Sequence, residues 1–263
     1  MDRVDYFSTS DQALSLIEGR YQRFKFQRHY HLDYHFGLIL EGQQRFVYQG
    51  SRYLAGPGDL VLMPPDELHD GHSFSESGYR SQVFALEPSW LINQLDAHSS
   101  TCLSFTHPLI RDPQVFSHLC QAHHALRQGN LSQLAQDCLP YETFGPLIDR
   151  YSHEKSSEPK HLGSQTLATL RDYLMAHLSE SIHLWQLANM CSLSPTQFQR
   201  HFKATFGLTP YAWLTRLRLE QAMKLLKAGV LGTDVAHQVG FYDQAHFSKA
   251  FKQCFGVSPS QIR

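Results

Sequence analysis

One pattern is written twice in this chain: FQRHFKATFGLTP at residues 198–210 and FSKAFKQCFGVSP at residues 247–259. The phenylalanines, a lysine, a glycine and a proline all recur at a common offset of 49 residues. Phenylalanine at i, i+4 and i+8 forms one apolar stripe on a helix, and glycine is typical of the position after a helix. One copy is compatible with any amphipathic helix. Two copies in the same register predict a repeated structural unit.

Residues 183–207 predict a helix-turn-helix. The first, short helix carries the small residue Ala188 where a second helix can cross closely. Ser194 is a favoured N-cap, and Pro195 suits the first helical position because its missing N–H would have no partner there. The second helix is expected over residues 196–205, with the phenylalanine stripe buried. Its outer face could reach base edges and phosphates in a major groove. The outer-face residues are Thr196, Gln197, Gln199, Arg200 and Lys203.

Residues 233–255 repeat this arrangement. Asp243 is the expected N-cap of the second copy's recognition helix. Its outer-face residues are Gln244, Ala245, His246, Ser248, Lys249 and Lys252. Helical hairpins of this shape also occur as packing units in proteins that do not bind DNA. The duplication and the Gln, Arg and Lys outer faces favour DNA binding.

Residues 211–227 read as an unbroken helix between the two copies. At 1.5 Å per residue such a helix spans about 26 Å. With the widths of the flanking units, it could place two recognition helices roughly one DNA turn, about 34 Å, apart. One chain could therefore read two successive major-groove segments.

Charge is unevenly distributed along the chain. The net charge of the whole chain is −1, yet residues 160–263 carry 11 Lys/Arg against 5 Asp/Glu. A basic end on a neutral chain is expected of a module that meets polyanions, although chance clustering of solvated charge would look the same. The 5 cysteines are scattered, and no apolar run approaches the roughly 20 residues of a membrane span. We expect reduced thiols and a cytoplasmic location.

Over residues 165–263 the chain resembles the AraC/XylS family of bacterial transcription regulators. The residues that carry the resemblance are Leu187-Ala188, Ser194, Phe202-Lys203, Gly207-Leu208-Thr209-Pro210-Tyr211, Arg218-Leu219, Ala222, Leu225-Leu226, Val235-Ala236, Gly240-Phe241, Phe247-Ser248, Phe251-Lys252 and Gly256-Val257-Ser258-Pro259. The resemblance implies base-reading positions at Thr196, Gln199 and Arg200, and at Gln244, His246 and Lys249. Cys191-Ser192 stands where the family usually has a glycine in the first turn, a departure we expect to be tolerated.

The first third of the chain predicts short strands. Residues 37–40, 44–48 and 60–63 are apolar or alternating runs separated by turn signals, in a region that extends from about 21 to 87. Such close spacing predicts a small antiparallel sandwich or barrel. Residues 113–151 then predict amphipathic helix, and residues 152–164 predict a linker.

Within this β-rich part, residues 29–42 and 58–69 resemble the two motifs of the cupin barrel, with His35 in the position of the usual glutamate. In metal-binding cupins these positions gather the ligands. Four neutral imidazoles would suit a divalent transition metal; they are His29, His31, His35 and His69. The alternatives are an organic effector in a metal-free pocket, or a structural role. Arg80, Arg45 or Arg52 could pair with an effector carboxylate, or could lie on the surface.

Together these patterns predict a multidomain chain. The expected parts are an all-β cupin-like barrel at residues 1–112, a helical dimerisation segment at 113–151, the linker at 152–164 and an all-α double helix-turn-helix domain at 165–263. The helical segment could instead cap the barrel of a monomer. The expected partners are operator DNA, a small-molecule or metal effector, a second copy of the chain and RNA polymerase.

The leading hypothesis for function is a sequence-specific transcription regulator that responds to an effector. The alternative is a metal-dependent cupin enzyme with an accessory DNA-binding domain. We do not expect an enzyme, because no general acid or base stands out beyond the histidines. An architectural DNA-binding protein would leave the β-rich half unexplained.

Overall fold

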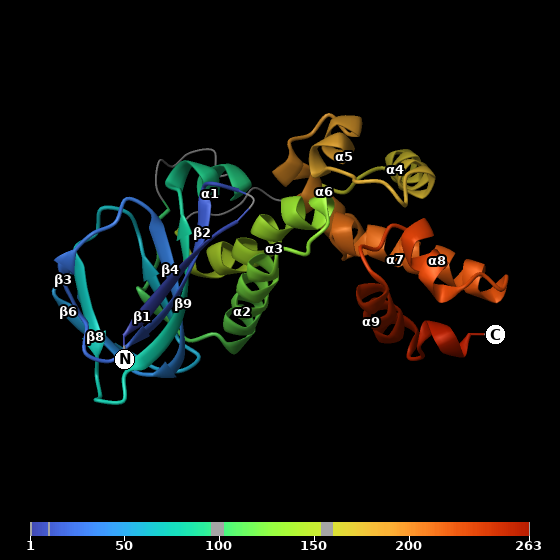
Figure 1. Cartoon of the computed structure of the whole chain (residues 1–263). Coiled ribbons are helices and arrows are strands. Elements are labelled where there is room, and N and C mark those ends of the chain that lie inside the picture. The colour runs from blue at the N-terminus through green and yellow to red at the C-terminus, as the bar shows by residue number, and fades with distance from the viewer. Residues whose placement is uncertain (1, 10, 96–102, 154–159, 263) are drawn as a thin grey trace. The chain divides into compact units, whose positions relative to one another are not determined.

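The computed structural model describes residues 2–9, 11–95, 103–153 and 160–262, which form two compact units (Figure 1). Unit 1 comprises Met1–Gly129 and Pro140–Ser157, and unit 2 comprises Asn130–Leu139 and Glu158–Arg263. Part of the predicted linker, residues 154–159, lies outside the described residues. Within the described ranges, no helix combines the length and the apolar character needed to cross a membrane.

Unit 1 contains two antiparallel sheets. The six-stranded sheet has the order β1-β2-β9-β4-β7-β10, and the four-stranded sheet has the order β3-β8-β5-β6. The strands are β1 Arg3–Ser8, β2 Leu14–Tyr21, β3 Lys25–His29, β4 Tyr34–Gly42, β5 Gln44–Tyr48, β6 Ser51–Ala55, β7 Leu60–Met63, β8 His69–Ser73, β9 Tyr79–Leu86 and β10 Leu109–Ile110. The three predicted strand runs are confirmed as parts of β4, β5 and β7.

Two strands precede the predicted start of the sheet region. β2 pairs with both β1 and β9, so it is an interior strand of the larger sheet. β1 is an edge strand whose residues are mostly exposed. An exposed edge strand needs no regular alternation of apolar residues, and β1 is held in the sheet by its pairing with β2. The sequence pattern therefore did not reveal it.

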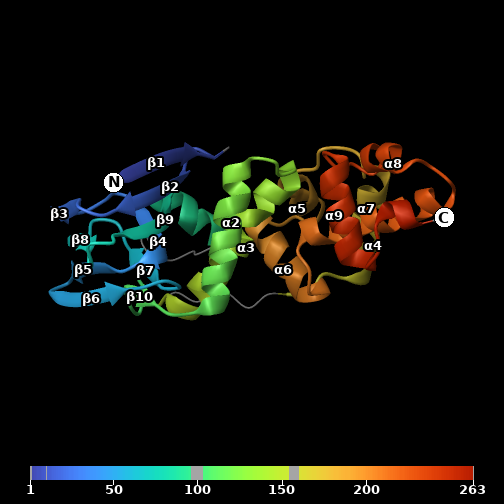
Figure 2. The same ribbon diagram turned by 60° about the horizontal axis from the view of Figure 1, so that its bottom comes forward.

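Three helices complete unit 1 and its connection: α1 Pro88–Leu95, α2 Pro113–Gln128 and α3 Gln133–Tyr151. Asp112 caps α2 by accepting a hydrogen bond from the Val115 N–H at 3.1 Å. Gly129, with φ +69°, ends α2. Figure 2 shows α2 in green beside the strands of unit 1, and it contacts β4 and β9. The predicted helical stretch is thus two helices, and residues 133–139 of α3 belong to unit 2.

Unit 2 is otherwise helical. Its remaining elements are α4 Ser164–Ala176, α5 Leu184–Met190, α6 Pro195–Phe206, α7 Pro210–Lys227, α8 Gly232–Gln238, α9 Gln244–Phe255 and the 3-10 helix η1 Pro259–Gln261. The predicted caps are confirmed. The Ser194 Oγ accepts from the Gln197 N–H at 3.2 Å, and the Asp243 Oδ1 accepts from the His246 N–H at 2.6 Å. The pairs α5–α6 and α8–α9 are the two predicted helix-turn-helix units.

Each helix-turn-helix has its own apolar core. Phe198 and Phe202 pack with Ala188 in the first core, and Phe247 and Phe251 occupy the corresponding places in the second. Each of these four phenylalanines is at most 1% exposed. α7 lies between the two helix-turn-helix motifs and contributes apolar side chains to both of their cores. The repeated stripe is therefore a packing device, and it leaves the opposite faces of α6 and α9 for other roles.

The turns of the two helix-turn-helix motifs have different residues at the position with a left-handed backbone conformation. Gly240 has φ +81° in the second turn, and Ser192 has φ +55° in the first. A serine in the left-handed region costs free energy that glycine avoids. The first turn nevertheless forms with Ser192 in the left-handed region. Ser192 is exposed, so its side chain has no packed neighbours to displace.

Replacing Gly240 with alanine should destabilise unit 2 strongly. An added Cβ would overlap the Leu178 carbonyl oxygen, and the positive φ would be strained. Together these effects should cost about 2–5 kcal/mol of the free energy of unfolding, measured by chemical denaturation. Gly207→Ala is the matched control: its φ is +71°, yet nothing lies within 4 Å of an added Cβ. We expect a loss of only ~1 kcal/mol there. Equal losses in both variants would contradict the packing argument.

Candidate DNA interface and effector pocket

The recognition helix of the second helix-turn-helix, α9, presents its predicted outer face to solvent. Gln244, His246, Lys249 and Lys252 are exposed, and Ser248 is half-buried. The Asp243 side chain accepts a hydrogen bond from a backbone N–H of the first turn, so α9 begins at a defined residue. This face combines hydrogen-bonding side chains with two lysines, as a helix in a major groove requires.

The recognition helix of the first unit, α6, is placed differently. Lys203 is exposed, and Gln197 is half-buried, with its Oε1 accepting from the Ser194 N–H at 3.3 Å. By contrast, the three implied base readers are buried. The exposed fractions are 8% for Thr196, 1% for Gln199 and 6% for Arg200. The expectation that this face is solvent-exposed is not met in this structure, and the base-reading role of the three residues stays a prediction.

The burial of Gln199 has a specific cause. Its Nε2 donates a buried hydrogen bond to the Cys138 carbonyl oxygen at 2.7 Å. Cys138 lies in the first part of α3, which packs within unit 2. The resemblance to the AraC/XylS family implied a dimerisation segment there, and the amphipathic pattern by itself was equally compatible with a helix that caps the barrel. The same apolar face also suits packing against another part of the chain, and no signal in the sequence distinguishes the two.

Unit 1 contains a cavity of about 320 Å³ lined by residues of both sheets. Alternation along β4 explains its wall. His35, Gly37 and Ile39 line the cavity, whereas Phe36 and Leu38 face away from it. Aliphatic and aromatic side chains of β2, β7 and β9 make up much of the remaining wall. The cavity is therefore largely apolar, and its polar lining comprises the four histidines together with Gln44, Asp70 and Ser81.

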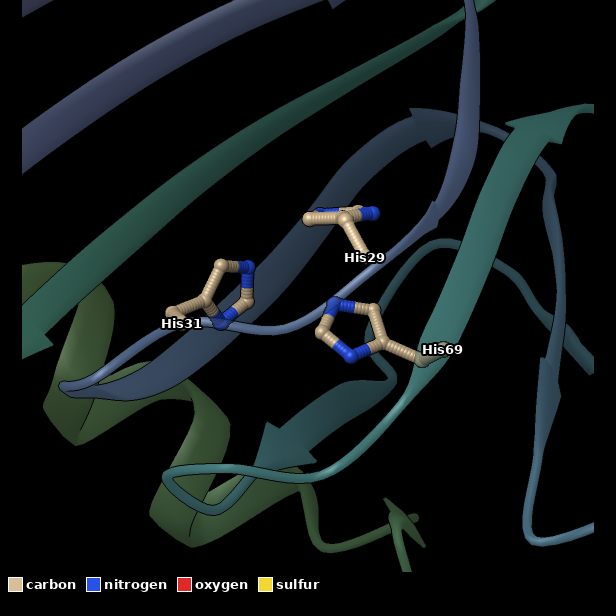
Figure 3. Close-up of side chains that lie close together, drawn as sticks. All are labelled: His29, His31 and His69. Atoms are coloured by element: carbon tan, nitrogen blue, oxygen red, sulfur yellow. The ribbon is translucent and has the colours of Figure 1, made fainter.

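The four predicted histidines meet at this cavity. Figure 3 shows His29, at the end of β3, His31, in the loop before β4, and His69, at the start of β8, gathered around one point. One nitrogen from each of these three rings lies within 4.8 Å of the other two. His35 is placed differently. Its ring stacks on that of His31 with 3.6 Å between the centroids. The structure thus brings three of the four together as a possible ligand set.

Hydrogen bonds fix the orientation of two of the rings. The Nδ1 of His29 lies 2.7 Å from the Gln27 carbonyl oxygen, and the Nδ1 of His69 lies 2.8 Å from that of Glu67. A carbonyl oxygen only accepts, so each Nδ1 carries the proton when the ring is neutral. The Nε2 lone pair of each ring is then available to a ligand. The Nδ1 of His31 is buried and has no hydrogen-bond partner among the described residues.

Burial favours the uncharged form of three of these imidazoles, those of His31, His35 and His69. It lowers the pKa of His31 to about 3 and that of His35 to about 4, and the neighbouring histidines add to the effect. Burial also lowers the pKa of His69. An imidazole must be neutral to coordinate a metal or to accept a hydrogen bond. His31, His35 and His69 are therefore in the protonation state that ligand binding needs.

The arginines proposed for an effector carboxylate do not line this cavity. Arg80 pairs with Glu41 at 2.8 Å, with both side chains largely exposed, and it lines a separate charged hollow on the surface. Arg45 lies over the ring of Phe74 at 4.7 Å. Arg52 is exposed on β6. Among the described residues, the lining contains no lysine or arginine, so the cavity offers an organic carboxylate no cationic partner.

Comparison with known proteins matches both parts of the chain. Residues 12–144 match the model of the AraC-like ligand binding domain, and residues 187–263 match that of a helix-turn-helix domain. The chain is 29% identical over 229 residues to YbfI of Bacillus subtilis, an uncharacterised HTH-type transcriptional regulator, with 84% of this chain and 81% of YbfI covered. It is 27% identical over 274 residues to the HTH-type transcriptional activator RhaS of Shigella sonnei, with 99% and 95% covered.

A solved structure also aligns with most of the chain. ToxT of Vibrio cholerae covers 95% of this chain and 97% of its own length, at 16% identity and a TM-score of 0.40. The family match rests on the ligand-binding domain, which spans half of the chain, and on the helix-turn-helix domain that follows it. The chain belongs to the AraC family of transcription regulators and joins the family's ligand-binding domain to a helix-turn-helix DNA-binding domain.

Proposed function

We propose that the chain binds promoter DNA through α9 and α6 and that a small effector in the histidine cavity changes this binding. One observation carries the proposal. The same chain holds a capped helix with an exposed polar and cationic face, and an apolar cavity with neutral imidazoles. We infer further that the two sheets of unit 1 form a cupin-like barrel around this cavity. The implied readers are Gln244, His246 and Lys249 on α9, and Thr196, Gln199 and Arg200 on α6.

The assembly and the sign of regulation follow as further parts of the proposal. The resemblance to the AraC/XylS family implies that the segment 113–151 also holds the dimerisation surface of two copies. RhaS is named as an activator, and an activating role for this chain would add a contact with RNA polymerase. The chain would act on cytoplasmic DNA.

Two lysines on α9 test the DNA interface. Lys249→Ala should relax sequence preference at a cost of roughly 1–3 kcal/mol in binding, whereas Lys252→Ala should weaken all duplexes alike and reduce the salt dependence by about one ion. Fluorescence anisotropy with a duplex from the chain's own upstream region and with a random duplex gives both values. Lys227→Ala removes an exposed lysine at the end of α7 and is the charge-matched control. Equal affinity of the wild-type chain for both duplexes at moderate salt would refute sequence-specific binding.

The chemistry of the cavity narrows the class of effector. Its lining combines imidazole nitrogens and a few other polar groups with a majority of aliphatic and aromatic side chains. The one carboxylate among the lining residues is that of Asp70, whose Oδ1 accepts from the Val47 N–H at 2.8 Å. A compact, uncharged molecule with a few hydrogen-bonding groups fits this arrangement better than an anion.

A transition metal is a second candidate for the cavity, favoured by the grouping of His29, His31 and His69. The residues present fit such an ion. Three imidazole nitrogens come from three separate segments, and two rings are oriented through Nδ1 by backbone carbonyls, as ligating histidines commonly are. Three neutral nitrogens suit zinc, copper, nickel or iron. When bound, the ion would supply a Lewis-acidic position for a donor atom of the effector.

Metal analysis of protein purified without an affinity tag tests this candidate. The metal hypothesis predicts about one ion per chain, and its loss in the His31→Ala variant. His72→Ala is the control, since His72 lies on β8 but outside the three-histidine group. A metal-free wild-type chain that still responds fully to an effector would exclude the ion and leave the organic effector.

A further inference from the structure

Residues 130–139, named here the cover segment, lie against the first recognition helix. The hydrogen bond from Gln199 to the Cys138 carbonyl oxygen joins α6 to this segment at 2.7 Å. A base edge cannot reach Gln199 in this arrangement, because the residue is 1% exposed. In the first helix-turn-helix, one implied base-reading side chain, Gln199, is therefore already hydrogen-bonded within the chain.

Apolar contacts anchor the cover segment. Leu134 and Cys138 are each 1% exposed. Both belong to the same core as Leu187 of α5 and as Phe198 and Phe202 of α6. The segment therefore contributes to the packing of the first helix-turn-helix and is not a loosely placed neighbour.

A carboxylate adds a third kind of contact. The Asp137 Oδ2 accepts a hydrogen bond from the N–H of Leu184, the first residue of α5, at 2.8 Å. A negative charge at a helix N-terminus is stabilised by the unpaired N–H groups and by the helix dipole. The cover segment thus holds both helices of the first unit, α5 through Asp137 and α6 through Cys138.

The second helix-turn-helix shows that the repeated fold does not itself require this burial. With the offset of 49 residues, Thr196, Gln199 and Arg200 correspond to Ala245, Ser248 and Lys249. Ala245 and Lys249 are exposed and Ser248 is half-buried. The two recognition helices share caps, length and phenylalanine stripe. The first is the one whose implied reading face is buried.

The cover segment also continues, through α3, to the sheet whose opposite face lines the effector cavity. α3 passes from this segment into unit 1, where Phe144 packs against Phe36 of β4 and Phe84 of β9, with ring centroids 5.9 and 5.2 Å apart. Phe36 follows His35, which lines the cavity. Pro140 lies inside α3, at the point where the helix changes unit. Proline cannot donate the helical hydrogen bond there, so the helix can bend at that residue.

We propose that the cover segment inhibits DNA binding by the first helix-turn-helix and that effector binding releases it through α3. This inference rests on the proposed function, because it names how the proposed regulator is controlled. The effector must favour the released arrangement over the covered one, and DNA must do the same. Effector and DNA then increase each other's affinity by the same factor.

Thiol labelling of the full chain tests whether DNA displaces the segment. Iodoacetamide is added with and without a saturating duplex from the chain's own upstream region, and each cysteine is followed by mass spectrometry. We expect Cys138 to be protected in the chain alone and to react at least tenfold faster with duplex bound. Cys120, half-buried on α2, is the internal reference and should not change. Duplex bound with Cys138 still protected would overturn the inference while leaving the proposed function intact.

A paired substitution tests whether the segment limits affinity. Leu134→Glu places a charge in the anchoring contact and should raise affinity for the same duplex at least tenfold without effector. Asn130→Glu adds the same charge at an exposed position and should not. An unchanged affinity in Leu134→Glu, with the helical content of the wild-type chain, contradicts inhibition. If neither the wild-type chain nor Leu134→Glu binds the duplex, the proposed function itself fails. That result is separate from bound duplex with a protected Cys138.

Discussion

Gly37→Val is expected to abolish the effector response while leaving DNA binding in place. Gly37 lies in β4 between His35 and Ile39 on the face that lines the cavity. An added Cβ would make ordinary contact with Val61, whose carbonyl oxygen lies 3.6 Å away, so the fold accepts the branch. The methyl groups beyond it would extend into a space of about 320 Å³. Overpacking of this size costs about 1–3 kcal/mol, hence roughly a 5–150-fold loss of effector affinity.

The stability of the variant separates blockage from misfolding. Valine favours strands and glycine weakens them, so Gly37→Val should keep or raise the melting temperature of unit 1. Gly37→Ala is the matched control and should retain most of the effector response. Calorimetric titration of the effector and anisotropy with duplex DNA supply the two readouts. A full effector response in Gly37→Val would show that the effector does not occupy this cavity.

Phe251→Ala should remove DNA binding by removing the core that holds α9. Phe251 is 0% exposed and packs against Phe247 and Phe255, with ring centroids 5.5 and 4.6 Å apart. Truncating a buried phenylalanine costs about 3–5 kcal/mol, a large part of the roughly 5–15 kcal/mol that stabilises a typical domain. Denaturation followed by circular dichroism measures the loss of stability, and anisotropy measures the loss of DNA binding.

Two further variants delimit this prediction. Gln253→Ala changes an exposed position of the same helix and should stay within about 0.5 kcal/mol of the wild-type chain. Phe202→Ala removes the corresponding residue of the first unit, which is 1% exposed, and should cost as much as Phe251→Ala. A stable Phe251→Ala variant with normal affinity for DNA would show that the second core does not position the reading face.

Local signals were sufficient to predict the double helix-turn-helix from sequence. The phenylalanine stripes, the Ser194 and Asp243 caps and the glycines after each helix act over a few residues, so they are legible without knowledge of the tertiary fold. The β4, β5 and β7 runs were found for the same reason. β1 was not, because an edge strand is specified by its neighbour and carries little alternation of its own.

The candidate effector site was predicted in part. Alternation along strands and the two motifs placed His29, His31, His35 and His69 at one cavity. The separation of the four into three convergent rings and one stacked ring depends on loop paths and on β3 pairing with β8. The position of Arg80 was equally undetermined, since an arginine near a cavity in sequence can pair outward with a carboxylate, as it does with Glu41.

The sequence alone determined which helices could read DNA, because periodicity, caps and repetition are properties of a contiguous stretch. The two cupin-like motifs also predicted which histidines could act together, but His31 lies in a loop, so the convergence of the rings depends on the fold. Only the tertiary structure decided which reading face is accessible. Burial of Gln199 depends on residues 130–139, which are distant from it in the chain, and an amphipathic helix does not specify the surface it covers. Packing between distant segments sets that choice.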